Sequence, residues 1–404
     1  MRRARHRAAI GVCAAYAGSV AVRLWLARAA MLDDPPIRMP RNDSQDGAMA
    51  PAREPAVTVL QPILSGDPLL ADLLAENADG HPDARFRWLV DEDDPLGQQI
   101  CRHLAETRAH VEVVLFPPVE PGANPKVFKL ARALRRAPDG AEHRTDAQAL
   151  PDELIAVLDD DTVLPPGALR AAVAALDRGD LVTGLPWYRS GSTLWSRLVA
   201  GFVNGNAAIS YLPLARLAPP VTINGMFYLT RRDTLERLGG FAAIERSLCD
   251  DLELAHLYRR AGGTIVQSTV THPLATTVPD LASYLRLQRR WMVFAGRLFA
   301  EQPVPRTIGL VALPSLLPLT AAVLAVGDPV ALAAVGVTVA GKALALAALR
   351  RKHLGTTESP ATIAAEIVAD LIQPAHAAAG FVRPRRIQWR TRSIRLDGDG
   401  VNYT

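Results

Sequence analysis

The stretch Leu154-Ile-Ala-Val-Leu-Asp-Asp-Asp161 decides the fold, because an uninterrupted apolar run ends directly in three carboxylates. A short, wholly apolar run is typical of a strand buried on both faces of a sheet. Side chains alternate along a strand, so Asp159 and Asp161 are expected on the same side of the extended chain. The stretch therefore predicts a buried strand whose carboxyl end presents two carboxylates to one divalent cation.

Two other interpretations of Asp159-x-Asp161 remain open at this level. The carboxylates could simply form an acidic turn before Pro165 and Pro166. The pattern also fits a phosphatase in which Asp159 is the phosphoryl nucleophile, but such an enzyme needs a Lys and a further acidic pair downstream. Lys126 and Lys129 lie upstream instead.

The surrounding sequence alternates short apolar runs with helical patterns. Strands are expected at 57–60, 86–90, 111–115, 154–158, 181–183, 221–229 and 264–267, and helices at 67–78, 96–108, 126–136 and 167–177. This alternation predicts an α/β domain with a largely parallel sheet. Ligands bind at the carboxyl ends of the strands in such sheets, so acidic residues that directly follow strands are the candidate site residues.

A second strand also ends in carboxylates, at Asp91, Asp93 and Asp94, although a solvated turn before a helix that starts at Pro95 would look the same. Lys126 precedes another expected helix, where a cation and backbone N–H groups suit a phosphate.

Further along the chain, Asp250 and Asp251 begin a helical pattern. One of the two is expected to cap the helix, while the dipole keeps the other ionised as a general base. Gln288, Arg290 and Trp291 follow an amphipathic stretch, and Arg and Trp in such a place also fit an interfacial anchor.

Apolar segments near both ends of the chain predict membrane association. Residues 8–27 suit either a membrane anchor or a signal peptide, and 307–327 with 329–349 are expected to form a transmembrane hairpin. Basic residues flank the open end of that hairpin, which predicts a cytoplasmic α/β domain. The segment 360–380 carries Glu366, Asp370 and His376 and is expected to lie in the interface.

Composition excludes several classes of protein. The chain has 404 residues, of which 49% are hydrophobic and 21% charged, and this rules out intrinsic disorder as the main state. Three widely separated cysteines, Cys13, Cys101 and Cys249, cannot form a disulfide framework or a zinc knuckle. We expect no nucleic-acid partner.

The motifs taken together, in their order and spacing, resemble the family 2 glycosyltransferases, and more closely the ceramide glucosyltransferase branch with its bacterial hopanoid-associated relatives. The resemblance covers roughly Val57 to Arg297. The matching motifs are Leu60-Gln-Pro62 with Gly66-Asp-Pro68, Asp93-Asp-Pro95, Asn124-Pro-Lys126, Asp159-x-Asp161, Gly184-Leu-Pro186, Asn224-Gly-Met226, Arg231-Arg-Asp233 with Gly239-Gly-Phe241, Asp250-Asp251 and Arg290-Trp291.

The resemblance implies a GT-A type fold, a nucleotide-diphosphate sugar donor, Mg²⁺ or Mn²⁺, and inversion at the anomeric carbon. It also implies roles for individual residues. Asp91, Asp93 and Asp94 would contact the nucleotide; Asp159 and Asp161 would bind donor sugar and metal; Asp251 would be the base; and Lys126, Gln288, Arg290 and Trp291 would bind the donor. The family has Gln or Arg three residues before its Arg-Trp pair, whereas this chain has Leu287 there and Gln288 next to it.

The sequence thus predicts a glycosyltransferase of the bacterial inner membrane that transfers a UDP-sugar's hexose to a ceramide-like or hopanoid lipid. A processive polysaccharide synthase, the phosphatase and an inactive membrane scaffold are the alternatives. The expected division of the chain is an anchor at 1–31, a linker at 32–56, a catalytic domain at 57–305, a hairpin at 306–349, and an interfacial segment with a basic tail at 350–404.

Overall fold

The computed structural model describes residues 2–34, 57–120, 122–135, 153–301, 304–356, 358–381, 386–389, 392–397 and 400–403. Their contacts divide the chain into two compact units. The sheet unit comprises Ile37–Leu185, Pro220–Thr276 and Arg390–Thr404, and the helix unit comprises Met1–Pro36, Pro186–Pro219 and Thr277–Trp389. These units cut across the contiguous division expected from the sequence, because three helices inside 57–305 belong to the helix unit.

The sheet unit contains a seven-stranded sheet in the order β3-β2-β1-β4-β6-β5-β7. Its strands are β1 (Val57–Pro62), β2 (Arg85–Asp91), β3 (Val111–Phe116), β4 (Leu154–Leu158), β5 (Leu181–Tyr188), β6 (Phe227–Arg231) and β7 (Ile265–Leu274). Its helices are α2 (Leu70–Gly80), α3 (Pro95–Ala105), α4 (Pro125–Arg135), α5 (Ala168–Leu176), α8 (Arg232–Arg237), the short η2 (Phe241–Ile244) and α9 (Asp250–Arg260).

The strands β3, β2, β1 and β4 are parallel, as the alternating pattern predicts. The strand β6 is antiparallel to both β4 and β5, and it lies between them. The sequence predicted a strand at 221–229, but only the part from Phe227 onward pairs, because Asn224 to Met226 form a turn at the edge of the sheet.

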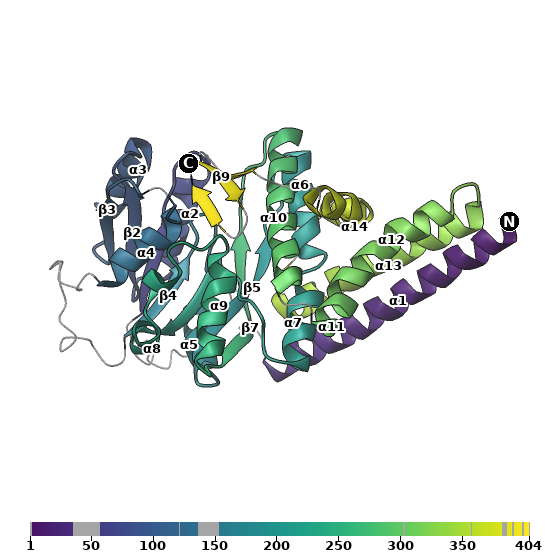
Figure 1. Ribbon diagram of the computed structural model, residues 1–404, viewed down its shortest axis with the longest axis horizontal. Coiled ribbons are helices and arrows are strands. Elements are labelled where there is room, and N and C mark those ends of the chain that lie inside the picture. Colours follow the sequence, from purple (N-terminus) through teal and green to yellow (C-terminus); the bar gives the residue numbers. More distant parts are fainter. Residues whose placement is uncertain are drawn as a thin grey trace, which may run out of the picture. The chain divides into compact units, whose positions relative to one another are not determined.

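Helices cover both faces of this sheet (Figure 1). On one face, α2, α3 and α5 pack on alternating residues such as Val59, Trp88 and Ala156. On the other, α4 and α9 pack on Leu60, Leu89 and neighbouring residues. A strand buried on both faces must be apolar throughout, which explains the unbroken hydrophobic run of β4.

The helix unit consists mainly of long helices. They are α1 (Arg2–Asp33), α6 (Leu194–Asn204), α7 (Ala208–Leu217), α10 (Leu281–Glu301), α11 (Pro305–Thr307), the π-helical turn η3 (Ile308–Ala312), α12 (Leu313–Leu324), α13 (Pro329–Leu354) and α14 (Pro360–Phe381). Three short strands are described near the C-terminus: β8 (Arg386–Trp389) belongs to the helix unit, whereas β9 (Arg392–Asp397) and β10 (Gly400–Tyr403) belong to the sheet unit and pair antiparallel.

Four stretches of the described chain are long and apolar enough to cross a membrane: Arg2–Asp33, Leu194–Leu217, Pro305–Leu324 and Pro329–Leu354. The sequence analysis anticipated all of them except Leu194–Leu217. That stretch is 61% buried within the protein, against 22–33% for the other three, and a turn at 205–207 divides it into α6 and α7. Its apolar surface is therefore mostly covered by protein.

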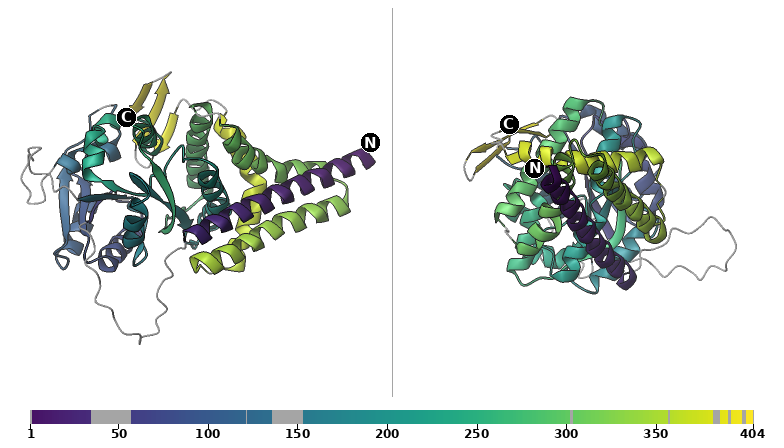
Figure 2. Two further views of the ribbon diagram at one scale, coloured as in Figure 1. Left: turned by 90° about the horizontal axis from the view of Figure 1, so that it is seen from below. Right: turned by 90° about the vertical axis from the view of Figure 1, so that its right-hand side faces the viewer.

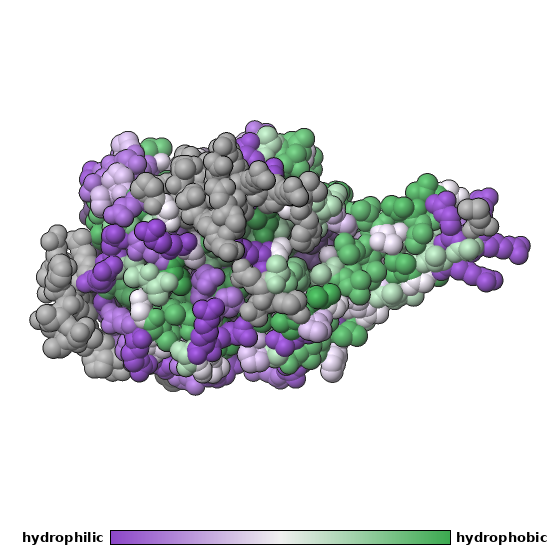
Figure 3. All heavy atoms as spheres, viewed as in Figure 1, coloured by the Kyte–Doolittle hydropathy of each residue, from purple (hydrophilic) through white to green (hydrophobic). Residues whose placement is uncertain are grey.

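The helices α1, α12 and α13 pack along one another, with the start of α1 against the turn between the other two (Figures 1 and 2). Arg2 donates to the Gly327 carbonyl (3.2 Å) and Arg5 to the Val323 carbonyl (3.3 Å). Hydrophobic residues cover the visible surface of this bundle up to a polar tip (Figure 3).

The helix α14 is joined to α13 by buried ion pairs. Lys342 Nζ lies 2.6 and 2.7 Å from the two Asp370 oxygens, and Tyr16 of α1 donates to the same carboxylate at 3.1 Å. Two turns farther along α13, Arg350 pairs with Glu366 and Glu358. The polar residues that suggested an interfacial helix are thus paired inside the helix unit.

Candidate active site

Three loops of the sheet unit meet at the carboxyl end of β4. The turn at 224–226, directly before β6, is held by Thr183 of β5, whose hydroxyl accepts from the Asn224 N–H (2.8 Å). That turn in turn accepts, through the Met226 carbonyl, the Asp159 N–H at 3.0 Å. These bonds keep the end of β4 beside the 224–226 turn. The start of α9 lies against the same turn, as a Cβ placed on Gly225 would be only 3.1 Å from Asp251 Cβ.

Lys126, in the first turn of α4, lies at the centre of this group. Its ammonium is 2.7 Å from Asp159 Oδ1, 3.2 Å from Asp250 Oδ2 and 2.8 Å from the Gly225 carbonyl. The structure places Lys126 against two carboxylates, and the predicted contact with a phosphate stays a prediction. Lys126 thereby links the acidic motif at Asp159 to the one at Asp250, a connection that the sequence does not reveal.

The mutual charges of this cluster shift its pKa values. Burial disfavours the Lys126 ammonium, but Asp159 and Asp250 outweigh this effect and raise the pKa of Lys126 well above its usual value. Burial also raises the pKa of Asp159 to about 6; Lys126 opposes that rise and Asp161 adds to it. Asp161 is therefore close enough to Asp159 for their charges to interact.

The carboxyl group of Asp251 has a higher pKa than that of Asp159. Burial, and then the neighbouring charge of Asp250, raise its pKa to about 7, although the Leu252 N–H donates to Asp251 Oδ1 at 2.8 Å. A carboxylate with a pKa near neutrality is suited to accept a proton during a reaction. The sequence expected one of the pair to cap α9, but Cys249 holds the N-cap position without a side-chain cap bond, and Asp250 faces Lys126.

Asp161 lies in the turn after β4, where the Thr162 N–H donates to the Asp159 carbonyl at 3.1 Å, so the chain turns here instead of staying extended as the sequence predicted. Its carboxylate accepts hydrogen bonds from Thr276 Oγ1 (2.9 Å) and Thr162 Oγ1 (3.3 Å), and its carbonyl accepts from the Ala275 N–H. The segment after β7 therefore fixes Asp161. No sequence motif had indicated Thr276.

The residues present suit a hard cation. Mg²⁺ is usually bound by one or two carboxylates and completed by substrate phosphates, and Asp159 and Asp161 supply carboxylates of that kind. Within the described part of the chain, no group of three or more His, Cys, Asp or Glu residues could hold a metal ion by itself. A cation here would be completed by oxygen ligands from water or a bound substrate.

The three aspartates at the end of β2, Asp91, Asp93 and Asp94, lie in different environments. Asp91 is buried and pairs with Lys129 Nζ at 3.1 Å. Asp94 caps α3 through the Gly97 N–H and binds Ser65; burial opposes ionisation, but these hydrogen bonds lower its pKa. Asp93 is exposed, so its carboxylate is the most accessible of the three.

The remaining predicted residues lie on α10, in the helix unit. Gln288 is fully buried, and Trp291 stacks on Phe202 with ring centroids 5.7 Å apart and meets Tyr188 edge-on at 6.2 Å. Arg290 is half-buried on the same helix. Leu287, which departs from the family pattern, is also half-buried. The neighbouring Gln288, rather than the residue at position 287, is therefore the buried one.

Comparison with known families identifies the class of protein. The model of glycosyl transferase family 21 matches residues 10–401, nearly the whole chain. The chain belongs to this family. It is a glycosyltransferase, and the predicted α/β architecture of GT-A type is confirmed. The family match supports the ceramide glucosyltransferase-like part of the predicted resemblance under the number 21 rather than 2, while the hopanoid branch stays a prediction.

Solved structures with similar folds are distant in sequence. A mannosyltransferase from Pyrobaculum calidifontis, solved with GDP-Man and Mn²⁺, is 19% identical with a TM-score of 0.48, covering 94% of this chain and 99% of that one. TarS 1-349 from S. aureus, solved with UDP-GlcNAc, is 12% identical with a TM-score of 0.36, covering 86% and 99%. Glucosyl-3-phosphoglycerate synthase from Mycobacterium tuberculosis is 17% identical with a TM-score of 0.37, covering 62% and 81%. No curated protein matches the chain.

Proposed function

We propose that this family 21 glycosyltransferase is an inverting enzyme of the bacterial inner membrane that transfers a hexose from a UDP-sugar to a lipid hydroxyl, ceramide-like or hopanoid. One observation carries the proposal: Lys126 joins the carboxylates of Asp159 and Asp250 at the sheet edge, beside Asp251. Such a cluster brings the carboxylates assigned to the donor and the assigned proton acceptor to the same edge of the sheet.

The residues of the sheet unit have distinct roles in the proposed reaction. The acceptor oxygen attacks the anomeric carbon in line with the departing nucleoside diphosphate, which leaves with the electron pair of the broken C–O bond. Asp251 takes the acceptor proton, because its pKa near neutrality balances proton affinity against ionisation. Lys126 holds the carboxylates of Asp159 and Asp250 in place and lowers the pKa of Asp159 against the effect of burial, so Asp251 binds a proton more readily than Asp159 does.

A divalent cation held by Asp159 and Asp161 would supply positive charge to the leaving diphosphate. The nucleotide is assigned to Asp91, Asp93 and Asp94, with exposed Asp93 as the direct contact. Gln288, Arg290 and Trp291 are assigned to the donor as well. These assignments rest on the family resemblance.

Removal of divalent cations tests the metal assignment. We expect EDTA to abolish sugar transfer and added Mg²⁺ or Mn²⁺ to restore it, because the leaving diphosphate then regains its counter-charge. The measurement is the initial rate of transfer at increasing free metal. Full activity in excess chelator would refute the assignment of Asp159 and Asp161 as metal ligands.

The lipid acceptor is proposed from the apolar helices that accompany the catalytic residues in one chain. The decisive experiment incubates the purified full-length protein with radiolabelled nucleotide sugars and extracted membrane lipids. A labelled glycolipid is the expected product. Labelled polymer in the absence of lipid would instead favour a processive synthase, and failure to bind any nucleotide sugar would favour an inactive scaffold.

The Asp251→Asn variant links this activity to the site. We expect transfer to fall about 10²- to 10⁴-fold, the usual contribution of a general base, while calorimetry shows donor binding largely unchanged. Asp177→Asn, on the exposed end of α5, is the matched control and should retain normal activity. Normal turnover in Asp251→Asn would refute the role of the base.

A further inference from the structure

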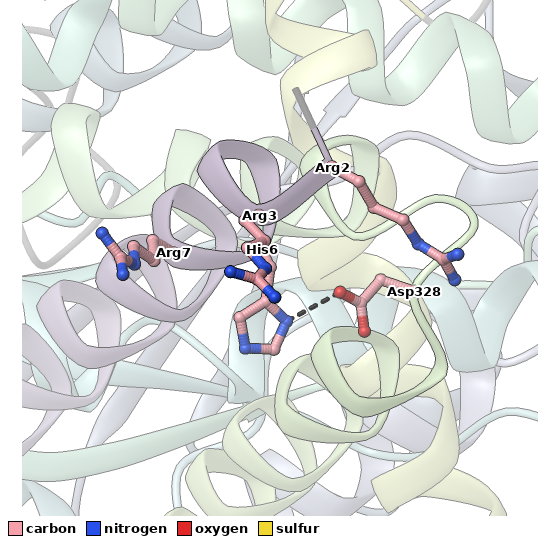
Figure 4. A pocket seen from close by; sticks show the side chains of 5 residues that line it. All are labelled: Arg2, Arg3, His6, Arg7 and Asp328. Carbon is pink, nitrogen blue, oxygen red and sulfur yellow. Dashed lines mark hydrogen bonds and ion pairs between the residues drawn. The ribbon is translucent and has the colours of Figure 1, made fainter.

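A basic cavity of about 420 Å³ lies at the polar tip of the α1, α12 and α13 bundle, within the helix unit (Figure 4). Among the described residues, its lining consists of Arg2, Arg3, His6 and Arg7 from the first two turns of α1, and Asp328 from the turn before α13. The proposed sugar transfer uses none of these side chains.

The one carboxylate in this lining is already engaged. Asp328 Oδ2 lies 2.7 Å from His6 Nδ1, and Asp328 Oδ1 accepts from the N–H groups of Val330 and Ala331 at 3.1 Å each. Asp328 therefore caps α13 and pairs with His6. Its single charge cannot also neutralise the three arginines of the lining.

The arginines differ in their contacts. Arg2 donates to the Gly327 carbonyl, a neutral acceptor. Arg3 and Arg7 are exposed, and within the described residues their guanidinium groups make no hydrogen bond or ion pair. The cavity thus carries a net positive charge, to which the positive end of the α1 dipole adds.

The surface next to the cavity is apolar. Val323, Val326 and Val330, at the end of α12 and the start of α13, are 58%, 64% and 65% exposed. In the space-filling view, hydrophilic side chains at the tip adjoin the hydrophobic surface of these helices (Figure 3). A cationic cavity beside exposed valines, at the end of apolar helices, matches a phospholipid: phosphate in the cavity and acyl chains on the valines.

We propose that this cavity binds the phosphate of an anionic phospholipid headgroup. Guanidinium groups bind phosphate through paired, charge-assisted hydrogen bonds. The bound phosphate pairs with the guanidinium groups of Arg3 and Arg7, offsets part of their charge, and ties the start of α1 to the α12–α13 turn. This inference concerns a site apart from the catalytic residues and does not depend on the proposed reaction.

The test measures lipid binding rather than sugar transfer. Purified full-length protein in neutral detergent is titrated with phosphatidylglycerol, phosphatidylcholine or inorganic phosphate, and occupancy is followed by native mass spectrometry. The variant Arg3→Gln/Arg7→Gln retains the Arg2 and His6 contacts that position the helix. Arg259→Gln/Arg260→Gln, at the exposed end of α9, removes the same charge elsewhere.

We expect phosphatidylglycerol to bind wild type and the Arg259/Arg260 control alike, and to bind Arg3→Gln/Arg7→Gln at least about tenfold more weakly, the equivalent of one lost charge-assisted hydrogen bond. Equal binding to all three proteins would overturn the proposal. Equal affinity for phosphatidylcholine would exclude selection of an anionic headgroup. Binding of inorganic phosphate as tightly as the lipid would show a free-phosphate site instead.

Discussion

Asp251 shows how strongly one side chain depends on its surroundings. Its pKa is raised to about 7 by burial and by Asp250, so the folded protein holds this proton more tightly than the unfolded chain does. For an acid with a raised pKa, ionisation works against folding, and stability falls as pH rises from the ordinary carboxyl range through about 7. The same shift makes the residue useful as a base.

We therefore predict opposite pH responses for stability and activity. Transfer should lose activity below about pH 7, where Asp251 becomes protonated. Asp251→Asn should unfold at a higher temperature than wild type at pH 8, and at nearly the same temperature at pH 4, because the wild-type carboxyl is then protonated in the folded state. Thermal unfolding at both pH values measures this, and equal midpoints at pH 8 would contradict the assigned pKa.

At the scale of elements, α14 shows that ion pairs between helices can bury charged residues that the sequence alone would place at a membrane surface. Its carboxylates, taken alone, indicate an interfacial helix, but Glu366 and Asp370 are only 1% and 5% exposed. They lie one turn apart on α14 and meet Arg350 and Lys342, two turns apart on α13. Buried charges in apolar surroundings persist only when paired, so this ladder specifies how the two helices align.

Exchange of the pair at Lys342 and Asp370 tests this alignment. Lys342→Met should destabilise the protein by about 3–5 kcal/mol, because Asp370 is left buried without its principal partner. The double variant Lys342→Asp/Asp370→Lys should recover most of the loss. Thermal unfolding in detergent measures both, with Lys352→Met, exposed on the same helix, as the control. An unaffected Lys342→Met variant would mean that the pair contributes nothing to the bundle.

At the scale of the whole molecule, the structure decides the direction of α1 relative to α12 and α13; arginines lie near both ends of α1, so the positive-inside rule does not. His6 pairs with Asp328, so the start of α1 and the α12–α13 turn lie at the same end of the bundle. The other end of α1, at Asp33, is the end that precedes the sheet unit in the sequence. A cytoplasmic sheet unit then requires the start of α1 to be outside.

Cysteine labelling tests this topology. The native cysteines are buried, so new ones can be followed separately. In intact cells, a membrane-impermeant maleimide should label Ala4→Cys and Val326→Cys, and should label Glu106→Cys, an exposed position of the sheet unit, only after permeabilisation. Different accessibility of Ala4→Cys and Val326→Cys would contradict the packing of α1. Labelling of Glu106→Cys in intact cells would contradict a cytoplasmic sheet unit.

The sequence by itself determined the alternation of strands and helices, the carboxylates at the ends of β2 and β4, and three of the four apolar spans. These features depend on the periodicity and composition of short stretches of sequence, so residues close together in the chain are enough to specify them. The tertiary structure alone decided that Lys126 joins Asp159 to Asp250, that β6 lies antiparallel between β4 and β5, and that α14 pairs with α13. Each of these depends on contacts between residues far apart in the chain, where packing and the need to neutralise buried charge select the partner.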